Sequence, residues 1–211
     1  NTTTTDANNT TSNANIGTIR CITDIDVTDD HLAPKLISQL KSIPELTYID
    51  IVINNAGYFY EPPESIINNC LNMKEELSMI DICALGPLRI VDALVQGAYL
   101  CTSSDIPSVP VDNTNDNTTN VANISNTQQT PSKIIMITSQ GGSISWRFTQ
   151  NPAGGDYGHH MSKAAANMMS VLVAQELKAL GINVGILHPG FNKTGMYVYI
   201  DEYICSVRVL M

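Results

Sequence analysis

Residues 133–142 read KIIMITSQGG, and this stretch decides the fold class. Lys133–Thr138 is a continuous apolar run, which is typical of a strand buried on both faces of a parallel sheet. Ser139-Gln140-Gly141-Gly142 follows directly and places a hydroxyl beside flexible backbone. Taken alone, a serine at the end of a strand is more often a turn or cap residue than a catalytic one.

Strands and helices alternate on both sides of this stretch. Tyr48–Asn54 (YIDIVIN) and Ile182–Leu187 are two further short apolar strands. Between the strands, Met73–Leu100 has helical spacing that Gly86-Pro87 is expected to interrupt, and Ser162–Leu180 is an Ala/Met/Leu-rich helix that Gly181 ends. Strands separated by helices of this length predict a doubly wound parallel α/β sheet.

The pattern begins earlier, with an apolar β-branched run in Ile16–Val27 that we expect to form a strand. Thr28-Asp29-Asp30 offers N-caps for a helix through about Leu40, with Pro34 tolerable near its first turn. Residues 1–15 and 112–130 are almost entirely Asn, Thr, Ser, Gln and Asp, and cannot contribute to a packed core. We expect a disordered tail over 1–15 and one domain over 16–211, with a disordered polar insert at about 102–132.

Composition excludes several classes of function. The 211 residues suffice for one α/β domain, and 20 acidic residues outnumber 11 basic ones, so a surface that binds nucleic acid is not expected. No uncharged apolar run approaches the roughly 20 residues that span a bilayer, and the N-terminus shows no secretory signal. The five scattered cysteines indicate reduced thiols and a cytoplasmic protein.

Polar or flexible residues follow each expected strand, where ligands bind in parallel sheets. Asn54-Asn55-Ala56-Gly57 ends the strand Tyr48–Asn54, although a simple turn explains it equally well. Lys163 is expected to open a helix, where its charge opposes the helix dipole and so suggests a role other than helix support. Pro189-Gly190, with Thr194 further on, follows the strand Ile182–Leu187.

Together these motifs resemble the short-chain dehydrogenase/reductase family. Their order is Asp-Val, Asn-Asn-Ala-Gly, Ser-x-x-Gly, Ser-Lys-Ala-Ala and Pro-Gly-x-x-x-Thr, over about Ile22 to Met196 without the insert. The strings SQGGSIS and GHHMSKAAANMM are most similar to the family's C-factor-like carbonyl reductase subgroup. The resemblance implies a three-layer Rossmann-like fold and hydride transfer between NAD or NADP and a small carbonyl or alcohol substrate.

The resemblance also implies a role for each residue at a matching position. Ser139 would donate a hydrogen bond to the substrate oxygen, and Lys163 would bind the nicotinamide ribose and lower the pKa of the acid beside it. Asp26 and Val27 would lie against the adenine. The remaining expected cofactor contacts are Asn54, Asn55, Ala56 and Gly57 along the adenosine, and Pro189, Gly190 and Thr194 at the carboxamide.

Four departures from the family pattern stand beside the matches. The glycine-rich turn that binds the pyrophosphate is absent from residues 1–211, as are the first βαβ segment and the C-terminal strand, so we expect a partial product of a longer sequence. His159 stands four residues before Lys163, where the family has its catalytic tyrosine, and Tyr157 lies two residues earlier. Cys83 replaces the asparagine expected three residues before Gly86, which weakens any proton relay there.

Two classes of function remain open. One is an NAD(P)(H)-dependent oxidoreductase with Ser139, His159, Lys163 and Cys83 at its catalytic positions. The other is a catalytically inactive relative that binds a partner, or a partial gene product without activity. A metal site at His159, His160 and His188 is not expected, because adjacent histidines in regular structure cannot both point into one site. The long helices suggest a homo-oligomer, through the resemblance alone.

Overall fold

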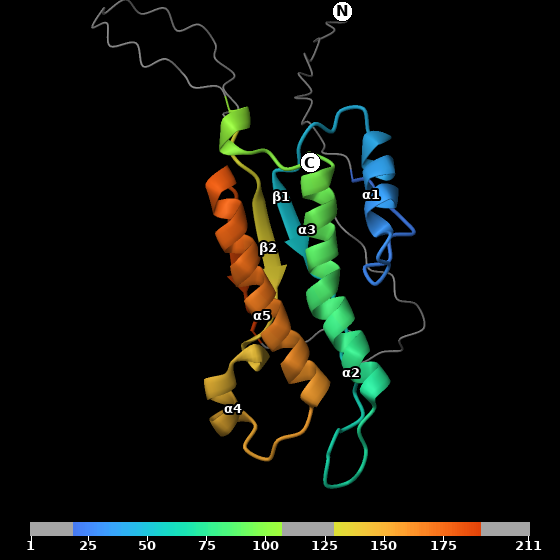
Figure 1. The fold of residues 1–211 in the computed structure, drawn as a ribbon, viewed down its shortest axis with the longest axis vertical. Helices are drawn as coiled ribbons and strands as arrows, with labels where there is room; N and C mark the ends of the chain where they lie inside the picture. Colours follow the sequence, from blue (N-terminus) through green and yellow to red (C-terminus); the bar gives the residue numbers. More distant parts are fainter. Residues whose placement is uncertain (1–18, 107–128, 191–211) are drawn as a thin grey trace, which may run out of the picture.

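The computed structural model describes residues 19–106 and 129–190, and its centre is a parallel sheet. Its strands are β1 (Ile51–Asn54), β2 (Lys133–Ile137) and β3 (Asn183–Leu187), and they lie in the order β1-β2-β3 (Figure 1). The register places Ile53 beside Ile135 and Ile135 beside Gly185. The three strands expected over these residues and the α/β fold class are therefore confirmed.

Helices connect the strands in the expected order. α1 (Leu32–Lys41) precedes β1, and α2 (Met73–Ile80), a π-helical turn (Asp81–Leu85) and α3 (Gly86–Gln96) lead from β1 towards β2. α4 (Ile144–Gln150) and α5 (Tyr157–Leu177) lie between β2 and β3. Gly181 ends the last helical turn with a φ of 76°, a left-handed conformation in which glycine is favoured, as the sequence predicts.

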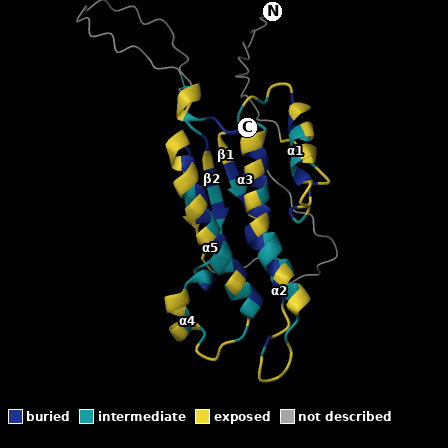
Figure 2. Cartoon of the chain, in the orientation of Figure 1, coloured by how far each residue is buried: buried dark blue, intermediate teal, exposed yellow. Residues whose placement is uncertain are grey.

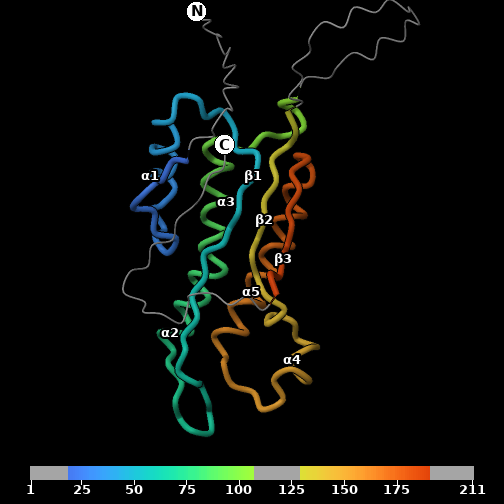
Figure 3. The backbone as a smooth tube through the Cα atoms, turned by 180° about the vertical axis from the view of Figure 1, so that it is seen from behind, coloured from blue at the N-terminus to red at the C-terminus, as the bar shows by residue number. Residues whose placement is uncertain are grey.

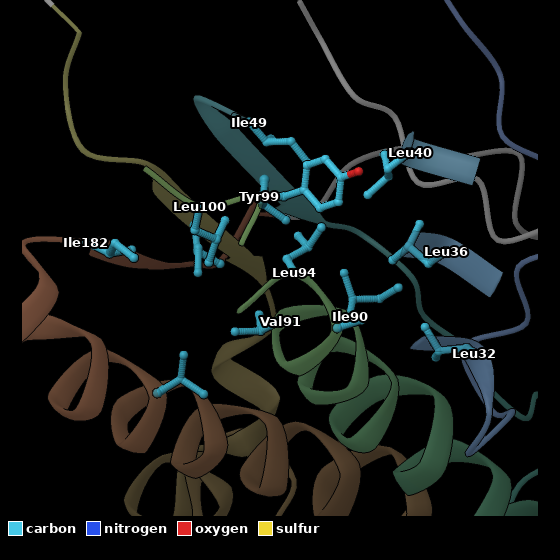
Figure 4. Packing of buried hydrophobic residues seen from close by; sticks show 14 of the residues in the cluster. Leu32, Leu36, Leu40, Ile49, Ile90, Val91, Leu94, Tyr99, Leu100 and Ile182 are labelled. Carbon is cyan, nitrogen blue, oxygen red and sulfur yellow. The ribbon is translucent and has the colours of Figure 1, made fainter. Parts of the chain in front are cut away.

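The helices α3 and α5 cover one face of the sheet (Figures 1 and 3). Val52, Ile134 and Met136 are buried beneath them, because alternate residues of a strand point to the same face. Leu32, Leu36 and Leu40 of α1 extend the core beside α3. Figure 4 shows Leu32 and Leu36 near Ile90 and Leu40 near Tyr99. Figure 2 shows the buried sides of α3 and α5 turned to the sheet. The described residues thus supply the sheet and one helix layer of the three-layer fold.

The strand expected in Ile16–Val27 is wrong for the part that the structure describes. Residues 19–27 form no strand, although Ile25 and Val27 are buried in the core. A strand is stabilised by backbone hydrogen bonds to a neighbour. Within residues 19–106 and 129–190, none of the three strands pairs with this segment. Ile25 and Val27 are therefore buried although their backbone forms no strand-to-strand hydrogen bonds with β1, β2 or β3.

The expected interruption at Gly86-Pro87 takes the form of a π-helical turn directly before Gly86, and the chain does not leave the helix. The chain stays helical from Met73 to Gln96, and the turn before Gly86 widens into a π-helix. A proline ring inside an α-helix clashes with the carbonyl four residues earlier, and a wider turn gives the ring room. Gly86 itself allows close packing, because a Cβ there would lie 2.9 Å from the Cβ of Val27.

Several expectations fall outside the described residues. They concern the tail 1–15, positions 107–128 of the insert, Thr194 and the end of the chain from 191 onward. In the part of the chain that is described, no helix is long and apolar enough to cross a membrane.

Candidate active site

Ser139 ends β2 and caps the short 3-10 turn Gln140–Gly142. Its Oγ accepts a hydrogen bond of 2.9 Å from the backbone N–H of Gly141, so the cap role expected of a lone serine is real. The hydroxyl also faces α5. A Cβ built on Gly141 would lie 3.2 Å from Ser139 Oγ and 2.9 Å from His159 Nε2. These two polar atoms therefore flank one point beside the sheet.

α5 begins at Tyr157, not at Ser162 as the sequence suggested. Asp156 precedes it with a φ of 50°, so the helix starts from a left-handed residue without a side-chain cap and gives no familiar start signal. Lys163 consequently lies in the second turn. The expectation that Lys163 opens the helix is wrong, and the argument from the helix dipole falls with it.

His159 is neutral in this setting. Burial lowers its pKa to about 4, and the neighbouring charges of His160 and Lys163 lower it in the same direction. Its ring meets Phe59 edge-on at 5.1 Å between centroids, and its Nδ1 is buried without a hydrogen-bond partner among the described atoms. At neutral pH His159 therefore presents an uncharged imidazole, a much weaker acid than imidazolium.

Lys163 lies one helical turn beyond His159 and points to the loop after β1. Its Nζ is 3.9 Å from the place where a Cβ of Gly57 would lie. A Cβ on Gly142 would come within 2.5 Å of the Lys163 carbonyl, so α5 rests directly on the turn that follows Ser139. The structure thus brings together Ser139, His159, Lys163 and Gly57, as the motifs predicted.

Cys83 sits in the π-helical turn and is buried. Its Sγ lies 3.4 Å from the backbone nitrogen of Tyr58 and 3.5 Å from the Tyr58 carbonyl oxygen. The thiol therefore holds the chain just after Gly57. This contact gives Cys83 a structural role that the sequence did not indicate.

Two residues that the sequence reasoning did not select complete the site. Asn167 accepts a hydrogen bond of 2.8 Å from Thr138 Oγ1, and its Nδ2 lies 3.4 Å from the Ser139 carbonyl. His160 Nδ1 lies 2.9 Å from the Gly141 carbonyl oxygen, and its Nε2 lies 3.1 Å from Asn151 Nδ2. The signal for Asn167 was its spacing, since positions 159, 163 and 167 share one helical face.

Comparisons with solved structures show which fold this chain has. The chain superimposes on the carbonyl reductase Sniffer of D. melanogaster with a TM-score of 0.61 and 21% identity, covering 82% of this chain and 60% of that one. It superimposes on NADPH-bound carbonyl reductase from chicken fatty liver with a TM-score of 0.59 and 21% identity, covering 84% and 60%. The chain has the short-chain dehydrogenase/reductase fold.

Sequence comparison finds two proteins with partial similarity. The chain is 28% identical over 151 residues to C-signal of Myxococcus xanthus, covering 70% of this chain and 68% of that protein. It is 38% identical over 64 residues to 1-hydroxy-2-glutathionyl-2-methyl-3-butene dehydrogenase of Rhodococcus sp. (strain AD45), covering 30% of this chain and only 26% of that enzyme. No protein-family profile matches the chain.

A nicotinamide cofactor, which the short-chain dehydrogenase/reductase fold implies, fits part of the described edge. Asn55 and Gly57 are exposed after β1, Pro189 and Gly190 are exposed after β3, and Lys163 Nζ lies 3.9 Å from the place where a Cβ of Gly57 would lie. Asn54 does not share this exposure, because it is buried and its Nδ2 lies 3.2 Å from Met136 Sδ. Ala56 is half-buried against the core. Four of the expected cofactor contacts in the described residues are therefore exposed at the surface, and their cofactor role stays a prediction.

Asp26 and Val27 are predicted to lie against the adenine, and in the structure both contact other residues of the protein. Asp26 Oδ1 accepts hydrogen bonds from the backbone N–H and the hydroxyl of Thr28, at 2.9 and 2.8 Å. Val27 is buried against Gly86. In the described part of the chain no hydrogen bond joins either residue to Ser139, His159 or Lys163, and their cofactor role stays a prediction.

The histidines do not form a metal centre within the described ranges. Both ring nitrogens of His160 have protein partners, Gly141 and Asn151. No group of three or more His, Cys, Asp or Glu side chains among the described residues could hold a metal ion.

Proposed function

We propose that this protein is an NAD(P)(H)-dependent oxidoreductase that transfers hydride between a nicotinamide and a small carbonyl or alcohol substrate. The observation that carries the proposal is the meeting of Ser139 Oγ and His159 Nε2 at one point, with Lys163 one turn further along α5. The carbonyl reductases on which the chain superimposes support it. The chain spans about three-fifths of those structures, and the activity of the whole protein is part of the proposal.

Each residue has a distinct part in this chemistry. The bound nicotinamide supplies or accepts the hydride. The Ser139 hydroxyl donates a hydrogen bond to the substrate oxygen, where negative charge develops, while accepting one from Gly141. The Lys163 ammonium adds positive charge beside that oxygen and binds the ribose. Asn55, Gly57, Pro189 and Gly190 border the cofactor.

His159 is the weak member of the set. A general acid works best when its pKa lies near the operating pH, and the pKa of the His159 imidazolium is lowered to about 4. The proton donor is therefore almost absent at pH 7. This observation favours a second candidate function, in which the protein is catalytically inactive and acts as a binding or scaffold protein.

His159→Tyr in the full natural polypeptide separates the two functions. A phenolate is stabilised by the Lys163 cation, whereas an imidazolium is not. We expect the variant to reduce a panel of small ketones and aldehydes with NADPH at least about tenfold faster than the natural protein, a conservative share of what a positioned acid contributes. Ser139→Ala in the variant background should abolish the gain.

Three results decide between the candidates. A gain with His159→Tyr over a slow but measurable natural rate supports the oxidoreductase, whereas the same gain over a natural protein without activity supports the inactive alternative. Fast reduction by the natural protein, with no gain from the variant, makes His159 a working acid and ends the inactive alternative. Failure of both proteins to bind NADPH or NADH in isothermal titration favours the binding protein.

We also propose that two copies of the protein pair through α3 and α5. The sides of α3 and α5 that face away from the sheet are partly exposed (Figure 2). The exposed apolar residues of these helices and of the turn before α3 include Leu85, Leu88, Val95, Met161, Met168 and Leu172. Stripes of this kind mark surfaces that another protein covers. Sedimentation should give twice the monomer mass, and Met168→Lys should return the protein to a monomer. We place the protein in the cytoplasm, in keeping with the free thiols of Cys21, Cys70, Cys83 and Cys101.

A further inference from the structure

Two buried glutamates meet below the first turn of α5. Glu64 lies in the loop between β1 and α2, and Glu76 lies in α2; their exposed fractions are only 5% and 4%. Glu64 Oε2 lies 3.4 Å from the backbone nitrogen of Gly158, and a Cβ on Gly158 would lie 2.6 Å from Glu76 Oε2. Gly158 immediately precedes His159, so the two carboxyl groups support the turn that carries it.

The two carboxyl groups lack hydrogen-bond donors and cations that would stabilise negative charge on both of them. Glu64 Oε1 and both carboxyl oxygens of Glu76 are buried without a hydrogen-bond partner other than each other in the described structure. Two ionised carboxylates cannot remain side by side in such a site, since each disfavours the charge of the other. Burial, and then the hydrogen bond and charge of Glu64, raise the pKa of Glu76 to about 7.

None of the ion pairs among the described residues brings a cation to either carboxyl group. The acidic and basic residues on the surrounding elements are Glu61 in the loop, Lys74 and Glu75 on α2, Asp156 before α5, and His159, His160, Lys163 and Glu176 on α5. Glu75 accepts a hydrogen bond of 2.6 Å from the Tyr58 hydroxyl, and the salt bridges among described residues do not include Glu64 or Glu76. His159 is itself neutral. A proton is then the simplest partner for the pair.

We propose that Glu64 and Glu76 share one proton, and that the protonated pair positions the first turn of α5 and with it His159. One carboxylate then faces the Gly158 N–H at the positive end of the helix, while the shared proton bridges the two groups. Loss of the proton leaves two buried negative charges and loosens this turn. As a statement about the reactivity of His159, the inference rests on the proposed function.

The pair should make folding depend on pH in a defined direction. The folded-state pKa of Glu76 lies above its ordinary value of 4.5, so the folded protein holds more protons than the unfolded chain between pH 4.5 and about 7. The stabilisation is complete below pH 4.5 and is lost as the pH rises through about 7. Between pH 5 and 8 the folded-to-unfolded ratio should fall about 10- to 100-fold more in the natural protein than in Glu76→Gln.

Hydrogen exchange tests the positioning role directly. In the full chain, protection factors for the amides at positions 158–162, corrected for intrinsic exchange, should fall about tenfold from pH 6 to pH 8. Glu76→Gln, whose amide can bond Glu64 at every pH, should keep them constant. Glu61→Gln is the matched control, because Glu61 lies in the same loop but is exposed, and it should behave as the natural protein does.

Infrared difference spectra provide a second readout on the natural protein. At pH 6 the natural protein should show a protonated-carboxyl band that Glu76→Gln lacks, and this band should vanish by pH 8. If Glu76→Gln does not fold, the band and its loss in the natural protein, together with Glu64→Gln, decide the question.

The inference is overturned if the band is absent at pH 6, or if the protection factors change equally in the natural protein and Glu76→Gln. It is also overturned if Mg²⁺ or Ca²⁺ at pH 8 restores protection to the natural protein alone, since the pair then holds a cation. None of these measurements involves NADPH or a carbonyl substrate, so their failure and the failure of the proposed function are separate results.

Discussion

The sequence predicts a strand both in the β2 region and in the segment before α1, yet only the β2 region folds as its pattern predicts. β2 and Ser139 lie where their motifs place them, and α5 contains most of the expected helix but begins five residues earlier. Residues 19–27 have the apolar, β-branched character of a strand and form none. The difference lies in neighbours: β2 is paired on both sides, whereas no described strand pairs with 19–27. An apolar, β-branched pattern shows that a segment can form a strand, but the strand forms only where a neighbouring strand is available to pair with it.

Different interactions hold the two regions in place. Around β2 and α5 the contacts are backbone against backbone, with Gly142 pressed onto Lys163 and Ala164. The segment before α1 depends on side chains instead. Arg89 of α3 forms ion pairs with Asp30 at 2.7 Å and Asp81 at 2.8 Å, and donates to the Val27 carbonyl at 3.0 Å. The comparison can be tested by breaking each region at its own contact.

The largest effect is expected from Gly142→Ala. The new Cβ would meet backbone atoms at 2.5 Å, and backbone of a packed helix cannot give way as a side chain can. We expect a loss of about 3 kcal/mol in the free energy of unfolding, measured by urea denaturation. Gly185→Ala is the control, because its nearest neighbour would be 3.9 Å away. Equal losses in both variants would show that the contact between α5 and the Ser139 turn is not specific.

Arg89→Ala should have the next largest effect and act on the other region. The side chain is only 20% exposed and bonds two carboxylates and a carbonyl. We expect a loss of about 2 kcal/mol, because hydrogen bonds that involve charged groups at partly buried sites are of that order. Arg20→Ala removes an exposed ion pair with Glu45 and should cost less than about 0.5 kcal/mol. If both arginine variants unfold alike, Arg89 does not hold the segment.

His159→Gln should show the smallest effect, visible only as a change with pH. The folded-state pKa of His159 is about 4, below its ordinary 6.5, so the unfolded chain binds more protons between these values. The stabilisation is present above pH 6.5 and is lost as the pH falls towards 4. Because the ring is only partly buried, the natural protein should lose about 1 kcal/mol more than His159→Gln between pH 7 and 5. Parallel pH profiles of the two proteins would contradict the burial of His159.

The strands of the described sheet and several residues of the candidate site could be predicted from the sequence. KIIMIT, YIDIVIN and Ile182–Leu187 identified all three strands of the described sheet, because buried parallel strands are short and apolar. Ser139 and Gly57 were selected because residues after parallel strands meet at one edge, whereas Lys163 lies in α5 and was selected through the Ser-Lys-Ala-Ala motif. The start of α5 was missed because Asp156 adopts a left-handed conformation that no pattern announces. The neutral charge state of His159 depends on burial by residues distant in sequence, and the same holds for the pair Glu64 and Glu76.

The π-helical turn Asp81–Leu85 determines which neighbouring helices the two halves of the long helix Met73–Gln96 face. This effect depends on how many residues the turn contains. One extra residue in an α-helix turns everything beyond it by about 100° about the axis. Met73–Ile80 can therefore face α5 while Gly86–Gln96 faces α1, although the two form a continuous helix. Removing a single residue from the turn would leave composition and helix propensity almost unchanged. It would nevertheless rotate one half of this helix away from the helix that it packs against. The number of residues in the turn therefore matters for packing independently of which residues they are.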